Sequence, residues 1–186
     1  MVRKIGIIHG SDSDLPQMLG GLTYLQTKEK QGLVKNLWVD CTSQHRHTLL
    51  VQRNLKEYHR ATSGSRPDIL IVGAGWANHL TGCCDAFLRY RLKDKNIVVF
   101  GVAFEDENSC RHTDAAELSI TEVPGTQVIF KGVGSKGFLR ACVAAVEDKD
   151  LPNIKVKSAP ESHRRDINEA TIEAFKRKKE SEKMIV

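Results

Sequence analysis

Two short polar segments carry the side chains best suited to acid–base chemistry on a phosphorylated ligand. The first is Gly10–Asp14, whose sequence Gly-Ser-Asp-Ser-Asp supplies two hydroxyls and backbone N–H groups ahead of an expected helix. The positive end of a helix suits a phosphate group, although the same sequence also suits a simple capping turn. In the second segment, the planar guanidinium of Arg46 can grip a phosphate with two hydrogen bonds. His45 beside it can carry a proton near neutral pH, whereas a lone loop histidine is often incidental.

Two further features bear on the kind of ligand. Gly73, Ala74 and Gly75 would let a ligand approach the backbone closely, and a tight strand-to-helix turn would need the same glycines. Asp14 could accept hydrogen bonds from ribose hydroxyls, cap the helix, or do both. The sequence contains neither the GxGxxG fingerprint nor a Walker loop, so a dinucleotide or a nucleoside triphosphate is disfavoured.

The elements that must position these residues follow from hydrophobic patterning. Continuous apolar runs alternate with longer amphipathic stretches, as in a parallel sheet covered on both faces. We expect strands at Ile5–Ile8, Leu37–Val39, Ile69–Val72, Ile97–Val102 and Gln127–Phe130. We expect helices to start at Asp14–Pro16 and to span Leu49–Ala61, Leu80–Leu92, Gly137–Val146 and Glu161–Lys183. The predicted fold is a three-layer α/β/α sandwich with a doubly wound parallel sheet, flavodoxin-like or Rossmann-like.

In such sheets, ligands bind beyond the carboxyl ends of the strands. The phosphate-loop candidate follows the first expected strand and His45 follows the second, while small or acidic residues follow the third and fourth. The sequence therefore predicts one site at this edge, within an α/β domain of residues 1–150. Residues 151–186 form an extension whose charged helix is expected to pack on the domain or on a neighbouring subunit.

Composition and charge exclude several classes of protein. The 186 residues are 40% hydrophobic and 27% charged, as in ordinary globular domains, and no apolar run is long enough to span a membrane. More than half of the net charge of +5 lies in the C-terminal tail. Acidic residues alternate with the basic ones there, and Phe175 is the sole aromatic residue of the tail. This composition disfavours nucleic-acid binding. Met1–Lys4 leads into the first expected strand without a signal-peptide core, which predicts a cytoplasmic protein.

The five cysteines show no CxxC spacing, so we expect free thiols rather than a disulfide framework. Zinc could be bound by the side chains of Cys41, His45 and His47, judged by residue type alone, and Cys110 and His112 could provide further ligands. No standard zinc spacing is present. We therefore interpret them as ordinary cysteines and loop histidines, and expect no metal.

Four segments, taken in order, resemble the motifs of the PurE family of purine-biosynthesis enzymes. Gly10–Asp14 matches the family's Gly-Ser-x-Ser-Asp loop, and Ser43–Arg46 fits its Ser-Ala-His-Arg/Lys motif except at the second residue. Gly73–Gly82 is similar to the family's glycine-rich turn, and Leu118–Gly125 to its Ser-Ile-x-x-Met-Pro segment. The resemblance covers most of the chain ahead of the tail.

The resemblance implies an enzyme that converts 5-aminoimidazole ribonucleotide (AIR) into its 4-carboxylate (CAIR), with CO2 or N5-carboxylated AIR (N5-CAIR) as the carboxyl source. It implies that His45 is the catalytic proton carrier, that Ser11, Ser13 and Arg46 hold the phosphate, and that Asp14 holds the ribose. The other residues implied to contact the substrate are Ser43, Gly73, Ala74, Gly75, Asn78, His79 and Leu80. The resemblance also implies a homo-octamer with active sites at subunit contacts, and no metal or organic cofactor.

The residues give mixed signals about the carboxyl source. Arg46 and His79 resemble the family members that take the carboxyl group from N5-CAIR, the mutases. Asn78 and the Leu-x-Gly sequence that follows His79 resemble those that take CO2 directly. Trp76 stands where the mutases carry glycine, and the balance slightly favours direct carboxylation. A second hypothesis stays open, in which a PurE-like paralogue carboxylates or only binds a different phosphorylated ribonucleotide.

Overall fold

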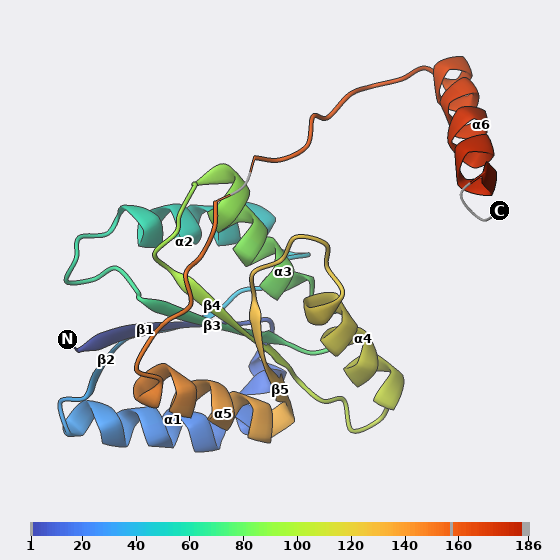
Figure 1. Ribbon diagram of the computed structural model, residues 1–186. Coiled ribbons are helices and arrows are strands. Elements are labelled where there is room, and N and C mark those ends of the chain that lie inside the picture. The colour runs from blue at the N-terminus through green and yellow to red at the C-terminus, as the bar shows by residue number, and fades with distance from the viewer. Residues whose placement is uncertain (1, 157, 184–186) are drawn as a thin grey trace.

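Five parallel strands form the central sheet of the computed structural model, which describes residues 2–156 and 158–183 (Figure 1). The strands are β1 (Arg3–His9), β2 (Val34–Cys41), β3 (Ile69–Ala74), β4 (Val98–Ala103) and β5 (Ile129–Val133). Each neighbouring pair is parallel, and the spatial order is β2-β1-β3-β4-β5. This order reverses direction between β1 and β3, as in flavodoxin-like sheets. The predicted doubly wound α/β fold is therefore confirmed.

Helices cover both faces of the sheet and complete the three layers (Figure 1). Helices α1 (Leu15–Lys30) and α5 (Gly134–Glu147) pack together on one face, drawn below the sheet in Figure 1. Helices α2 (Thr48–Arg60), α3 (His79–Ala86) and α4 (Cys110–Thr121) cover the other face. A 3-10 turn, η1 (Asp12–Asp14), leads into α1, and a π-helical turn, η2 (Phe87–Arg91), continues α3.

Residues that are adjacent in the central strand pack against opposite layers. In β3, Ile69 and Ile71 join the apolar cluster under α1 and α5. Leu70 and Val72 join the cluster under α2 and α3. All four are completely buried, so the strand requires apolar residues at successive positions rather than at alternate ones.

The helices that follow β3 and β4 differ from the sequence-based prediction. The structure places α4 at Cys110–Thr121, a segment for which we predicted no helix. The predicted helix over Leu80–Leu92 is an α-helix only as far as Ala86 and then widens into η2. At that point the buried Arg89 pairs with Asp85 at 2.9 Å and donates to two backbone carbonyls. The two carbonyls belong to Asp94 and Ile97, so these bonds attach the widened turn to the segment just ahead of β4.

The C-terminal extension starts against the domain and ends in α6 (Ile167–Lys183). Ile154 is buried in the cluster under α1 and α5, and Gln127 exchanges two hydrogen bonds with the Lys155 backbone. Helix α6 begins later than predicted because the Asp166 carboxylate accepts the first free N–H groups of the helix. Figure 1 shows α6 standing away from the sheet. Among the residues described, no helix is both long and apolar enough to cross a bilayer.

Candidate active site

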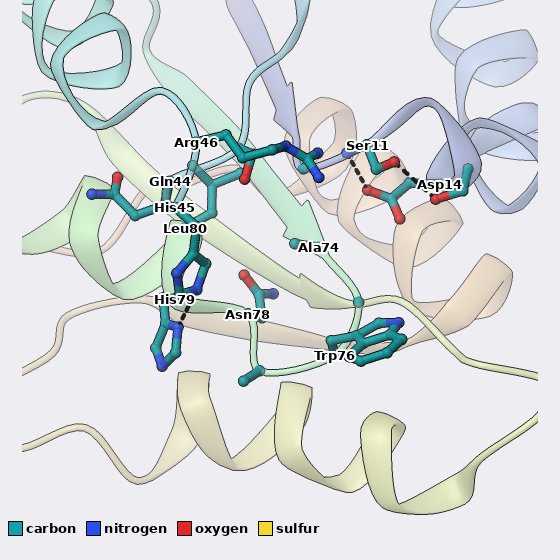
Figure 2. A pocket seen from close by; sticks show the side chains of 15 residues that line it. Ser11, Asp14, Gln44, His45, Arg46, Ala74, Trp76, Asn78, His79 and Leu80 are labelled. Carbon is teal, nitrogen blue, oxygen red and sulfur yellow. Dashed lines mark hydrogen bonds between the residues drawn. The ribbon is translucent and has the colours of Figure 1, made fainter.

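A cavity of about 490 Å³ opens at the edge of the sheet where β1, β2 and β3 end (Figure 2). Its walls come from the loops that follow these strands and from the first turn of α3. Every predicted site residue except Gly73 lines it: Ser11, Ser13, Asp14, Ser43, His45, Arg46, Ala74, Gly75, Asn78, His79 and Leu80. The strand order reverses at this edge, which is where doubly wound sheets bind ligands.

The Gly10–Asp14 loop folds back on itself and presents two hydroxyls to the cavity. Asp14 accepts the Ser11 N–H at 2.9 Å, and the Ser13 hydroxyl donates to the Ser11 hydroxyl at 3.0 Å. A Cβ atom at Gly10 would lie 2.9 Å from the Cβ of Ala74, so only glycine lets this loop pack so closely on β3. Burial raises the pKa of the Asp14 carboxyl group, and its backbone hydrogen bonds oppose that effect. Asp14 therefore caps the turn while also lying on the cavity wall.

Arg46 supplies the positive charge of this part of the cavity. Figure 2 shows its side chain extending toward Ser11 and Asp14. The described residues place no carboxylate within salt-bridge distance of its guanidinium. The guanidinium and the two serine hydroxyls thus form a corner rich in hydrogen-bond donors, which is the chemistry that binds a phosphate group.

Two histidines meet at another part of the cavity. Nε2 of His45 lies 2.8 Å from Nδ1 of His79, and the ring planes cross edge to face with their centroids 4.8 Å apart. A hydrogen bond between two ring nitrogens needs a proton on one and a lone pair on the other. Both rings are exposed, so either can exchange its proton with a ligand or with water. The geometry of this pair is therefore suited to moving a proton within the cavity.

Asn78 fixes the start of α3 rather than presenting a free side chain. Its Oδ1 accepts hydrogen bonds from the N–H and the hydroxyl of Thr81, and its Nδ2 donates to the Val102 carbonyl at 2.9 Å. The side chain is 2% exposed. This cap holds His79 and Leu80 in the first turn, where free N–H groups favour a negatively charged ligand.

Trp76 forms an aromatic wall of the cavity. Its ring stacks on His112 of α4 with centroids 4.0 Å apart and planes 19° apart. His112 is held in turn by Asp106 at 2.6 Å, and this hydrogen bond lowers the pKa of the Asp106 carboxyl group. Trp76 is 65% exposed and adopts φ 54°, a left-handed conformation that is unfavourable for a bulky residue. The strained backbone thus holds an exposed indole ring at the cavity wall.

Gly73 is the predicted residue that lies elsewhere. A Cβ atom there would come within 2.6 Å of the Phe104 ring, so packing of β3 against Phe104 by itself requires a glycine here. The cavity wall also includes Gly10, Gln44, Trp76 and Ala77, which were not among the predicted site residues. All four lie within the loop segments that the sequence analysis assigned to the site, so taking each whole segment would have included them. The contact of His112 with Trp76 gave no such signal, because His112 lies on α4, a helix that the sequence pattern did not reveal.

Comparisons with known proteins agree on one family. The family model described as AIR carboxylase matches residues 4–165. The chain is 30% identical over 164 residues to N5-carboxyaminoimidazole ribonucleotide mutase of Pyrococcus abyssi, which covers 88% of this chain and 83% of that protein. It is 29% identical over 171 residues to the mutase of the same name from Aliivibrio fischeri, covering 91% and 95% respectively.

A solved structure supports the fold independently. The crystal structure of Treponema denticola PurE superposes with a TM-score of 0.57 at 21% identity, over 79% of this chain and 83% of that one. At this identity the likeness speaks for the fold alone. Together with the family match over most of the chain, it shows that the chain belongs to the PurE (AIR carboxylase) family of purine-biosynthesis proteins.

Proposed function

We propose that the protein forms CAIR by moving a carboxyl group from the exocyclic nitrogen of N5-CAIR to the neighbouring ring carbon. The observation that carries the proposal is the hydrogen-bonded pair of His45 and His79 in a cavity that also holds a phosphate-binding corner. The two curated relatives described above bear the mutase name, which also favours transfer over direct carboxylation.

The cavity offers a complementary group to each part of the substrate. The phosphate would bind Ser11, Ser13 and Arg46, and Asp14 would accept from the ribose hydroxyls, because the Arg46 side chain extends from the loop after β2 toward the loop after β1. The imidazole would then extend toward His45. The carboxylate would lie at the start of α3, where the unpaired N–H groups of the helix stabilise negative charge.

The proton balance of a transfer reaction suits the histidine pair. Cleavage of the N–CO2 bond of N5-CAIR releases CO2 and needs one proton at the exocyclic nitrogen. Attack of the ring carbon on CO2 then forms the C–C bond, and loss of the ring proton restores aromaticity. One proton is given and one is recovered, so a pair that holds a single shared proton can complete the cycle without exchanging it with solvent. His45 would be the residue that touches the substrate.

The experiment feeds the enzyme N5-CAIR in buffer containing 13C-labelled bicarbonate. Unlabelled CAIR is the expected product, since the CO2 formed in the cavity is consumed there. A parallel feed of AIR with labelled bicarbonate should give slower formation of labelled CAIR. Two results together would identify a direct carboxylase. Labelled CAIR would form faster from AIR and labelled bicarbonate than CAIR forms from N5-CAIR, and N5-CAIR would be consumed only after it had decayed to AIR. The His45→Asn variant provides the background rate for both feeds.

The same proposal includes the environment in which the enzyme acts. We infer a cytoplasmic homo-octamer that uses no metal or organic cofactor for the carboxyl transfer and binds no nucleic acid. Helix α6 supports the assembly, because Ile167, Ile172 and Phe175 are 79%, 58% and 64% exposed on it. Packing against a neighbouring subunit would remove this apolar surface from water. Light scattering of the full chain measures the oligomeric state directly, and a monomer would overturn the proposed octamer.

Trp76 favours a second candidate function, binding or carboxylation of a ribonucleotide with a larger ring. An exposed indole on the wall of the cavity can stack on a heterocycle, and a pyridinium ring would gain a cation–π contribution. The chain has two tryptophans, and Trp38 is already stacked on Tyr58. Quenching of Trp76 fluorescence by a pyridinium ribonucleotide at lower concentration than by AIR would favour this candidate. In the Trp76→Phe variant the fluorescence of Trp38 alone remains, so loss of the quenching there would assign it to Trp76.

A further inference from the structure

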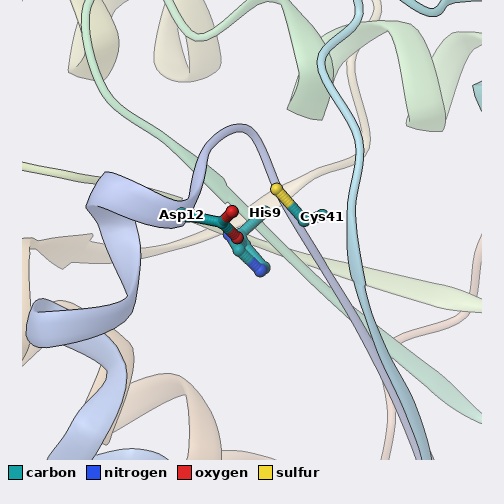
Figure 3. A group of neighbouring side chains, drawn as sticks. All are labelled: His9, Asp12 and Cys41. Atoms are coloured by element: carbon teal, nitrogen blue, oxygen red, sulfur yellow. The ribbon is translucent and has the colours of Figure 1, made fainter.

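A group of three potential metal ligands lies beside the cavity and outside its wall. His9 ends β1 and Cys41 ends β2, and the two are paired in register across the sheet. Asp12 joins them from η1 (Figure 3). One ligand atom of each residue lies within 4.8 Å of the others. In the part of the chain that the structure describes, this is the one such group of three or more His, Cys, Asp or Glu residues.

The His9 ring is held in the form that a metal ligand needs. Its Nδ1 lies 2.8 Å from the Ser11 carbonyl oxygen, and a carbonyl can only accept, so the neutral ring carries its proton on Nδ1. The lone pair then resides on Nε2, for which no hydrogen bond occurs among residues 2–156 and 158–183. Metal-binding histidines commonly donate their other ring nitrogen to a backbone carbonyl in this way. His9 is 2% exposed, so its ring is fixed by its surroundings.

The other two residues lie close together on the exposed side of the group. The Cys41 thiol and the Asp12 carboxylate lie within 4.8 Å of each other, and both side chains are exposed. A divalent cation would take the place of the thiol proton, which leaves to solvent as the metal–sulfur bond forms. A site with one buried imidazole and two accessible ligands leaves an open side through which the ion can enter.

We propose that His9, Asp12 and Cys41 bind one Zn²⁺ ion, with water as the fourth ligand. A thiolate, an imidazole and a carboxylate together are a zinc donor set, whereas Mg²⁺ and Ca²⁺ prefer oxygen ligands alone. The site differs from the grouping of Cys41 with His45 and His47 that the sequence offered. The fold brings Cys41 to His9 instead, because β1 and β2 are neighbours.

A bound ion would tie the phosphate-binding loop to the sheet. Asp12 lies between Ser11 and Ser13, which line the cavity, and Cys41 ends the strand ahead of Arg46. None of the three proposed ligands lines the cavity itself. Zinc would therefore fix the distance between the two halves of the phosphate corner without occupying the substrate's place. The proposal depends only on these ligands, so it stands or fails apart from the proposed reaction.

The test is a zinc titration of the full chain against a chromophoric chelator, with Co²⁺ substitution as a second readout. We expect one equivalent of zinc, no competition by excess Mg²⁺, and a thiolate-to-cobalt charge-transfer band. Cys41→Ser and Asp12→Asn should each weaken zinc binding more than about 100-fold, a loss beyond that typical of residues that only support a ligand. Both positions are exposed, so these variants should melt like the wild type without zinc.

The matched control is Cys83→Ser, which removes another exposed thiol and should leave the zinc affinity and the cobalt band unchanged. Zinc should raise the melting temperature of the wild type and of Cys83→Ser but not of Cys41→Ser. Failure of the wild type to bind one equivalent, or equal affinity in Cys41→Ser, would overturn the proposal.

Discussion

His45 and His79 share one hydrogen bond of 2.8 Å although they are separated by the whole of α2 and β3 in the chain. The contact forms because the loops after β2 and β3 both return to the same edge of the sheet. One nitrogen of the pair must be protonated and the other not, since two N–H groups facing each other at this distance would repel. The contact therefore fixes how one ring is oriented relative to the other.

Replacing His45 should abolish the chemical step and spare binding. We expect His45→Asn to lower kcat by about 100- to 10,000-fold, the usual range for loss of a general acid–base group, with the ligand Kd almost unchanged. Steady-state kinetics and isothermal titration with AIR measure the two quantities. His47→Asn is the matched control, because His47 lies in the same loop but outside the cavity wall. Normal turnover by His45→Asn would show that another group carries the proton.

His79 should act as the positioning partner of His45. His79→Ala leaves the His45 ring without its hydrogen bond, and we expect kcat to fall by up to about 100-fold with little change in KM. His79→Asn keeps a polar group near the Nδ1 position and should recover part of the loss. Equal rates for both variants and the wild type would mean that the contact has no part in catalysis.

Arg46 should contribute to binding rather than to the chemical step. Its guanidinium faces the serine loop without a competing carboxylate among the described residues, so it is available to a phosphate. We expect Arg46→Ala to weaken AIR binding by about 1.5–3 kcal/mol, or roughly 10- to 150-fold in Kd. Arg53→Ala removes an exposed guanidinium of α2 that pairs with Glu57 and serves as the control. A Kd unchanged in Arg46→Ala would place the phosphate elsewhere.

The sheet was predictable because burial on both faces leaves a plain signal. Leu70 and Val72 must be apolar for one layer and Ile69 and Ile71 for the other, so the run in β3 is continuous. Helix α4 left no comparable signal. It buries only Ala116 and Ile120, and its remaining residues are mostly polar, so the amphipathic pattern is too weak to identify it.

Contacts between loops were less predictable than the loops themselves. The motifs identified Ser11, His45 and His79 as members of one site, but nothing in their spacing shows that His45 bonds to His79. The stack of Trp76 on His112 depends on α4, which the pattern did not reveal. The pairing of Cys41 with His9 depends on strand register. Such partners are fixed by tertiary packing and not by local sequence.

Asp94 should make the fold sensitive to acid. Its carboxylate is completely buried and accepts from His59, Arg66 and the N–H groups of Asn96 and Ile97. Burial alone would raise the pKa of Asp94, but these hydrogen bonds and the Arg66 charge outweigh it and hold the pKa below the ordinary value of an aspartate. A depressed folded-state pKa gives stability that is present above the unfolded value and lost as pH falls through the folded one.

Asp94→Asn should therefore lower the free energy of unfolding at pH 7 by about 1.5–3 kcal/mol and flatten its decline below pH 4. Urea denaturation over a series of pH values measures both effects. Asp68→Asn is a suitable comparison, because Asp68 also pairs with a cation, Lys4, but is more exposed. If Asp94→Asn kept the full acid dependence of the wild type, other carboxylates would be responsible.

Helix α6 should be an assembly element. Its apolar residues Ile167, Ile172 and Phe175 fall within one broad side of the helix, and their exposure would be unfavourable in an isolated monomer. We expect Phe175→Ser to shift the protein toward smaller species in light scattering across a dilution series, because burial of a phenylalanine is worth roughly 1.5–3 kcal/mol at each repeated contact. Glu180→Gln, at an exposed position on the opposite side of the same helix, should leave the distribution unchanged. An assembly unaffected by Phe175→Ser would mean that the subunits associate through the domain and that α6 has another partner.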